Sequence, residues 1–157
     1  MDALGDRMFV NNNPFEKVKK RTDLNGLQKM QWAILMNQSD EAQVELTKQA
    51  IPLLKNPRIL AGMIDSNRRV LAPRWLELIE EGKKDGSIHT EYARELSELM
   101  VLLDLWMLPS VFPGGMEEIH ARFMCMMEML EKMGLPLYNK ELEEKLMSLP
   151  YFSEEKK

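Results

Sequence analysis

The sequence predicts an all-α protein, a bundle of about six to seven helices, and three observations support this class. Apolar residues recur at spacings of three and four along most of the chain, which is the period of a helix and not of a strand. Asparagine–proline pairs precede several apolar runs and glycines follow them, as they do at helix ends. With 157 residues, the chain is large enough to form one hydrophobic core without disulfides or metals.

Caps and breaks in the apolar pattern divide the chain into helical segments. Asn56 and Pro57 combine an N-cap with proline at the first helical position. Thr22 or Asp23 is expected to cap the helix that carries Trp32. The expected helices cover residues 1–10, 14–20, 23–38, 41–54, 57–82, 92–109, 116–133 and 139–149, and the first of these reads as the end of a longer helix.

Prolines and glycines set further boundaries. Pro52 is expected to bend the fourth segment or end it early, and Pro73 to kink or divide the fifth. Gly86 is the kind of residue that closes a helix in the left-handed conformation. Thr90 and Asn139 are then expected to cap the two helices that follow them.

Composition excludes several classes of function. The formal net charge is −4 and the isoelectric point is about 5.3, which argues against nucleic-acid binding by this chain alone. No apolar run reaches the roughly 18 residues of a membrane span, and Asp104 interrupts the longest candidate. Cys125 is the single cysteine, so there is no disulfide framework and a cytoplasmic location is expected.

The residues that carry chemistry do not form a catalytic or metal site. Glu117 and His120 have the Glu-x-x-His spacing of carboxylate metal proteins, but that chemistry needs the motif twice, and His89 has no glutamate three residues before it. Cys125 and His120 lie five residues apart, near opposite faces of one helix, and therefore cannot act as nucleophile and base. We expect no enzyme activity, no metal and no cofactor.

Polar side chains on apolar helix faces are more informative. Gln31, Asn67, Arg68, Asp104 and His120 each interrupt an apolar stripe. They either satisfy one another, with Asp104 pairing across a dimer interface as one option, or line a pocket and orient a ligand there. The 14 methionines fit both alternatives, because methionine fills irregular cores and also adapts to varied ligands.

The segment 92–109 is too apolar to be a one-sided surface helix. One stripe contains Tyr92, Leu96, Leu99 and Leu103, and further apolar residues occupy the other sides. A helix that is apolar nearly all round must be covered nearly all round. The chain's own helices would cover one side, and a second copy of the chain is the expected cover for the rest.

Four stretches carry a resemblance to a known family. They are NPFEKVKKRTDLNGLQKMQ, NPRILAGMIDSNRRVLAPRWLELIEEGKKDGSI, HTEYARELSELMVLLDLWMLP and MGLPL. In this order and spacing they resemble the C-terminal ligand-binding and dimerisation domain of TetR/AcrR-family transcriptional regulators. The similarity covers residues 1–149, with 1–20 as the remnant of a connecting helix and 150–157 as a C-terminal tail.

The chain departs from that family at its beginning. Members start with an N-terminal helix-turn-helix domain, and MDALGDRMF resembles the start of the helix that follows that domain. The chain is then a trimmed form, a product started at an internal methionine, or a natural relative without the DNA-binding head. DNA binding is therefore expected only of a longer form that carries the head.

The resemblance implies a homodimer, formed through a four-helix bundle, that senses a small apolar or amphipathic effector. The effector would displace the connecting helix and so control DNA binding by the missing head. The residues expected to line the effector site are Phe15, Leu27, Gln31, Ile34, Met63, Asn67, Trp75, Ile79, Leu99 and Leu103. Those expected at the dimer interface are Leu102, Leu105, Trp106, Ile119, Phe123, Met126, Met127 and Leu130. The alternative is a headless dimerisation or protein-interaction module without a small-molecule effector.

Overall fold

A computed structural model describes residues 14–39 and 41–147, and within these ranges the chain is all-helical, without strands. The predicted all-α class is thereby confirmed. The expected helix over 1–10 and the tail 150–157 lie outside the described residues. The helices are α2 (Pro14–Lys19), α3 (Gly26–Ser39), α4 (Glu41–Ala50), the 3-10 helix η1 (Ile51–Lys55), α5 (Pro57–Ser66), the π-helical η2 (Asn67–Leu71), α6 (Ala72–Asp85), α7 (Ala93–Trp106), α8 (Met116–Lys132) and α9 (Lys140–Met147).

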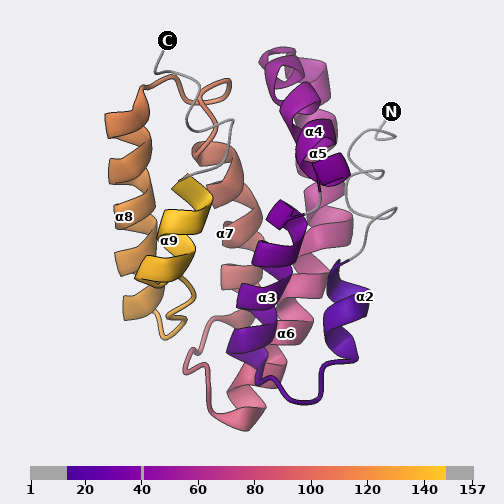
Figure 1. Cartoon of the computed structure of the whole chain (residues 1–157), viewed down its shortest axis with the longest axis vertical. Helices are drawn as coiled ribbons and strands as arrows, with labels where there is room; N and C mark the ends of the chain where they lie inside the picture. Colours follow the sequence, from indigo (N-terminus) through magenta and orange to yellow (C-terminus); the bar gives the residue numbers. More distant parts are fainter. Residues whose placement is uncertain (1–13, 40, 148–157) are drawn as a thin grey trace.

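The helices surround α7. Figure 1 shows α8 and α9 on one side of α7, with α2, α3 and α6 on the other side and α4 and α5 at one end. Helix α6 packs closely along α7 and is joined to it by a short turn, so the two run antiparallel. Gly86 in this turn has φ +88°, and the Tyr92 amide donates to the Thr90 hydroxyl 3.0 Å away. Gly86 ends α6 as predicted. Thr90 does not cap α7, because the N-cap is Tyr92, and the Thr90 hydroxyl bonds only within the turn that precedes the helix.

Proline divides the long rod that contains α5, η2 and α6. Asn56 caps its beginning by accepting a hydrogen bond from the Arg58 amide at 2.9 Å, as predicted. Pro73 lacks an amide proton and its ring would clash with a carbonyl one turn earlier in a regular α-helix. The chain relieves this conflict with the π turn of η2, in which the Ala72 amide reaches back to the Asn67 carbonyl. The rod therefore stays continuous, but the side chains that follow Asn67 are rotated about the helix axis relative to their positions in a regular α-helix.

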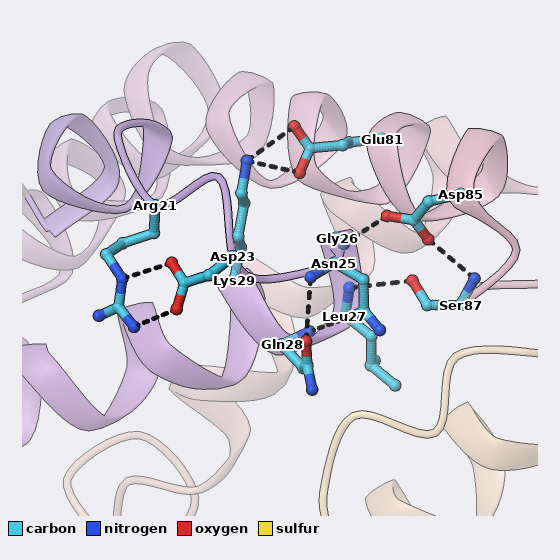
Figure 2. A network of polar contacts seen from close by, with 10 residues as sticks. All are labelled: Arg21, Asp23, Asn25, Gly26, Leu27, Gln28, Lys29, Glu81, Asp85 and Ser87. Carbon is cyan, nitrogen blue, oxygen red and sulfur yellow. Dashed lines mark hydrogen bonds and ion pairs between the residues drawn. The ribbon is translucent and has the colours of Figure 1, made fainter.

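The first turn of α3 is anchored to the end of α6. The Gly26 amide donates to Asp85 Oδ2 at 2.7 Å, and the Leu27 amide donates to the Ser87 hydroxyl at 3.2 Å (Figure 2). Lys29 Nζ lies 2.8 Å from Glu81 Oε2 and adds an ion pair between the same helices. These bonds satisfy amides that a helix cannot pair within itself.

The N-cap of α3 differs from the prediction. Asn25 Oδ1 accepts from the Gln28 amide at 2.8 Å, and Gln28 Oε1 accepts from the Asn25 amide at 3.0 Å, which is a capping box. Asp23 is not the cap because its carboxylate accepts hydrogen bonds from Nε and Nη2 of Arg21, at 2.9 and 2.8 Å. The same ion pair lowers the pKa of Asp23 to about 2.

Helix α9 closes the bundle over α8. The Leu142 amide donates to Asn139 Oδ1 at 2.8 Å, which confirms the predicted cap. His120 Nε2 lies 3.0 Å from Glu143 Oε1 and joins the two helices at the surface. The His120 side chain is more exposed than the sequence suggested, although it does lie at a helix–helix seam.

The interior contains two apolar clusters. The main cluster lies around α7 and draws on α2, α3, α6, α8 and the segment before α9. A second cluster lies at the end of the bundle and contains Ala50, Leu54, Met63 and Leu105. The chain itself thus covers α7 on more sides than the sequence indicated.

Candidate functional site

Two buried polar atoms on the divided rod have no hydrogen-bond partner. They are Oδ1 of Asn67, a residue that is 4% exposed, and Nε1 of Trp75, a residue that is 6% exposed. Leaving such a group unsatisfied costs about 1 to 3 kcal/mol. Native proteins satisfy the great majority of buried polar atoms, so an unpaired acceptor and an unpaired donor on one rod are unusual.

Trp75 connects this rod to α2. Its ring packs edge-on against Phe15, with the ring centroids 4.8 Å apart. The Arg74 guanidinium lies 5.8 Å from the centroid of the same Phe15 ring, and Lys19 Nζ lies 3.1 Å from Glu77 Oε2. A change in the position of Trp75 would therefore directly affect the position of α2.

Asp104 continues a stripe of buried residues on α7 but is itself exposed. At 3.6 residues per turn it lies one turn beyond Met100 and two turns beyond Ser97, and both of these residues are buried. The Asp104 side chain nevertheless keeps solvent-accessible surface. Burial among protein atoms raises the pKa of Asp104 to about 7.

Tyr138 lies in the segment before α9 and is partly buried against the main cluster. Its ring packs edge-on against Phe123 of α8, with the centroids 5.2 Å apart. Burial raises the pKa of Tyr138 well above its usual value, and the charge of Asp104 raises it further.

The two sets of groups lie on neighbouring elements. Segment η2, which carries Asn67, packs directly against α7, and the antiparallel course of α6 and α7 places η2 beside the half of α7 that carries Asp104. The interior thus contains an unpaired hydrogen-bond acceptor and an unpaired donor among apolar side chains. This combination suits an amphipathic small molecule. Within residues 14–39 and 41–147, no group of histidine, cysteine and carboxylate side chains is arranged to hold a metal.

The structure places most of the predicted effector-site residues in one region. Phe15, Trp75, Ile79 and Leu103 belong to the main cluster, and Leu27, Ile34 and Leu99 pack against it. Two residues are placed otherwise. Gln31 Nε2 donates to the Leu137 carbonyl at 2.9 Å and so ties α3 to the segment before α9, while Met63 lies in the second cluster. The assignment of these residues to an effector site stays a prediction.

The predicted dimer-interface residues fall into two groups. Five are buried within the chain itself: Leu105, Ile119, Phe123, Met126 and Leu130. Trp106 and Met127 are partly buried, and Leu102 is 49% exposed. Helix α8 also exposes Met124, at 45%. Pairing of α7 and α8 with a second copy stays a prediction, and it would have to use the outward faces that carry Leu102 and Met124.

Sequence reasoning named Asp104 as a polar group that either pairs across a dimer interface or lines a pocket, and it did not name Tyr138. Asp104 interrupts an apolar stripe in the sequence, and in the structure it is exposed whereas its neighbours Leu103 and Leu105 are buried. Tyr138 lies in an irregular segment without helical periodicity, and no pattern in the sequence points to it.

Comparisons with known proteins add no relative. No protein-family model matches the chain, and neither a curated protein nor a solved structure is significantly similar to it. Among the described helices, none has the length and apolar character needed to cross a lipid bilayer.

Proposed function

We propose that this chain is the effector-sensing and dimerisation domain of a TetR-like transcriptional regulator. In this proposal it binds a small apolar or amphipathic molecule, and the binding controls a helix-turn-helix domain in a longer form of the protein. The observation that carries the proposal is the unpaired acceptor of Asn67 and the unpaired donor of Trp75 inside an otherwise apolar interior. The sequence resemblance supplies the regulatory role.

The contact between Trp75 and Phe15 supports a route from ligand to DNA. A ligand shifts a conformational equilibrium only by binding one state better than the other. A molecule that bonds to the Trp75 indole and displaces its ring would push on Phe15 and therefore on α2, which the resemblance assigns to the connecting helix. The ligand would then favour an arrangement of α2 in which the distance between the two heads is unsuitable for binding DNA.

Binding of N-phenyl-1-naphthylamine tests the proposal. This probe is apolar, fluoresces in apolar surroundings and carries an N–H group that can donate to Asn67 Oδ1. We expect saturable binding with one molecule per chain. Asn67→Leu removes one hydrogen bond and should weaken binding about 5- to 10-fold.

Gln49→Leu is the matched control, because Gln49 is an exposed amide whose bond to Glu45 Oε1 is a surface contact. It should leave the dissociation constant unchanged. Absence of saturable binding, or equal affinity in the Asn67→Leu variant and the wild type, would overturn the assignment. That result would favour the alternative of an interaction module without an effector.

A further inference from the structure

The π turn of η2 brings the two unpaired polar groups onto one face of the rod. Asn67 and Trp75 are eight residues apart, and eight residues of regular α-helix would leave their side chains about 80° apart around the axis. In η2 the Ala72 amide bonds to the Asn67 carbonyl, five residues back instead of four, so the turn contains one extra residue. About seven α-helical steps then remain, which is within about 20° of two full turns. Asn67 and Trp75 therefore share a face and are separated by roughly 10 Å along the axis.

This face is buried at both polar positions and between them. Leu71, about one turn from each, is 5% exposed. Asn67 Oδ1 can only accept a hydrogen bond and Trp75 Nε1 can only donate one, and neither atom has a partner. A molecule that satisfied both atoms would therefore need a donor at one end and an acceptor at the other.

The interior has no spare charge for a charged ligand. Among the buried residues of the described ranges, Lys29 is the one with a charged side chain, and its Nζ lies 2.8 Å from Glu81 Oε2. A charged ligand group would meet no uncommitted buried partner there, and a buried charge without a partner is costly. The two unpaired atoms of the shared face are both neutral, so they favour a neutral ligand.

We propose that the interior site takes an uncharged ligand with a hydrogen-bond acceptor at one end, a donor at the other and an apolar body between them. The acceptor receives the Trp75 indole N–H, the donor bonds to Asn67 Oδ1, and the body lies over Leu71. Aromatic ketones with a phenolic hydroxyl are simple members of this class. This inference rests on the proposed function, because it names the chemical class of the effector.

The test is calorimetric titration with three probes of similar shape. 4-Hydroxyacetophenone carries both groups, 4-methylacetophenone lacks the donor, and 4-isopropylphenol lacks the carbonyl acceptor. Asn67→Leu should weaken the two phenols about 5- to 10-fold and leave 4-methylacetophenone unchanged. Trp75→Phe should weaken the two ketones by a similar factor and leave 4-isopropylphenol unchanged. Gln49→Leu, at an exposed amide, should change none of the three affinities.

Two measurements need no variant. At neutral pH, 4-hydroxybenzoate, in which a carboxylate replaces the acetyl group, should bind the wild type at least tenfold more weakly than 4-hydroxyacetophenone does. In a ¹⁵N–¹H spectrum of the wild type, assigned by triple-resonance methods, the Trp75 indole proton should lie further downfield with either ketone than with 4-isopropylphenol, because a carbonyl that accepts its hydrogen bond deshields it.

The outcomes separate this inference from the proposed function. Equal losses for all three probes in each variant, a Trp75 proton that does not distinguish the ketones, or 4-hydroxybenzoate binding as tightly as 4-hydroxyacetophenone overturns the inference. If N-phenyl-1-naphthylamine binds in a manner that depends on Asn67 and the three probes behave alike, only the inference on ligand class fails. If neither kind of probe binds, the proposed function fails as well.

Discussion

At the scale of the residue, Asn67 links stability to ligand binding. Its unpaired Oδ1 costs free energy in the folded protein and gains a partner only from a ligand. Asn67→Leu should therefore raise the free energy of unfolding of the ligand-free protein by about 1 to 2 kcal/mol, although it weakens binding of the probe. Chemical denaturation in urea measures this change.

Asn139→Leu provides a control for that result. It is the same substitution at an asparagine whose Oδ1 accepts from the Leu142 amide, so it should lower stability by about 1 kcal/mol. If both variants were destabilised equally, Asn67 would be a satisfied structural residue and not part of a binding site.

Asp104 predicts a distinctive dependence of stability on pH. An unperturbed aspartate has a pKa of 3.8, whereas burial raises the pKa of Asp104 in the folded protein to about 7. Between these values the folded protein holds a proton that the unfolded chain has released, so raising the pH across this window destabilises the fold. Asp104→Asn removes this effect, and its melting temperature should exceed that of the wild type at pH 8 by more than at pH 5. An equal difference at both pH values would show that Asp104 is ordinarily hydrated.

At the scale of the element, the crossing of α3 and α6 depends on glycine. A Cβ atom built on Gly26 would lie 2.2 Å from the Gly82 nitrogen and 2.4 Å from its Cα, and backbone atoms cannot move aside as a flexible side chain does. Gly26→Ala should lower the free energy of unfolding by about 1 to 3 kcal/mol, or roughly 3 to 10 °C in Tm. Differential scanning calorimetry measures this change in Tm. Lys20→Ala, at an exposed residue, is the control and should have a Tm close to that of the wild type.

Most helix boundaries were predictable from local chemistry. Asn56, Asn139 and Gly86 act through neighbours in the sequence, so their roles could be inferred before the fold was known. The N-cap of α3 was not predictable, because Arg21 binds the Asp23 carboxylate and so prevents it from capping the helix. The partners of Asp85 and of Gln31 lie 59 and 106 residues away, and local patterns do not contain such pairs.

At the scale of the whole molecule, α7 and α8 present apolar side chains outward. Leu102 and Met124 are 49% and 45% exposed on these helices, although most of their apolar residues are buried by the chain itself. Under the proposed function these faces pair with a second copy. Light scattering after size exclusion should then give twice the 18.3 kDa mass of the chain.

Charged substitutions on the two faces test that pairing. Leu102→Glu combined with Met124→Glu should give a folded monomer, whereas Leu53→Glu, at a residue that is 46% exposed on η1, should leave the dimer intact. A wild-type mass of one chain in dilute solution would contradict the dimer, without bearing on the interior site.

The most direct test of the interior site is the indole N–H resonance of Trp75. The chain has three tryptophans, and loss of one cross-peak in Trp75→Phe assigns the resonance in a ¹⁵N–¹H spectrum. On addition of N-phenyl-1-naphthylamine, the Trp75 resonance should shift strongly. The resonance of Trp32, whose ring lies under the Arg21 guanidinium at 5.8 Å, should stay in place. An unmoved Trp75 resonance at saturating probe would contradict the account.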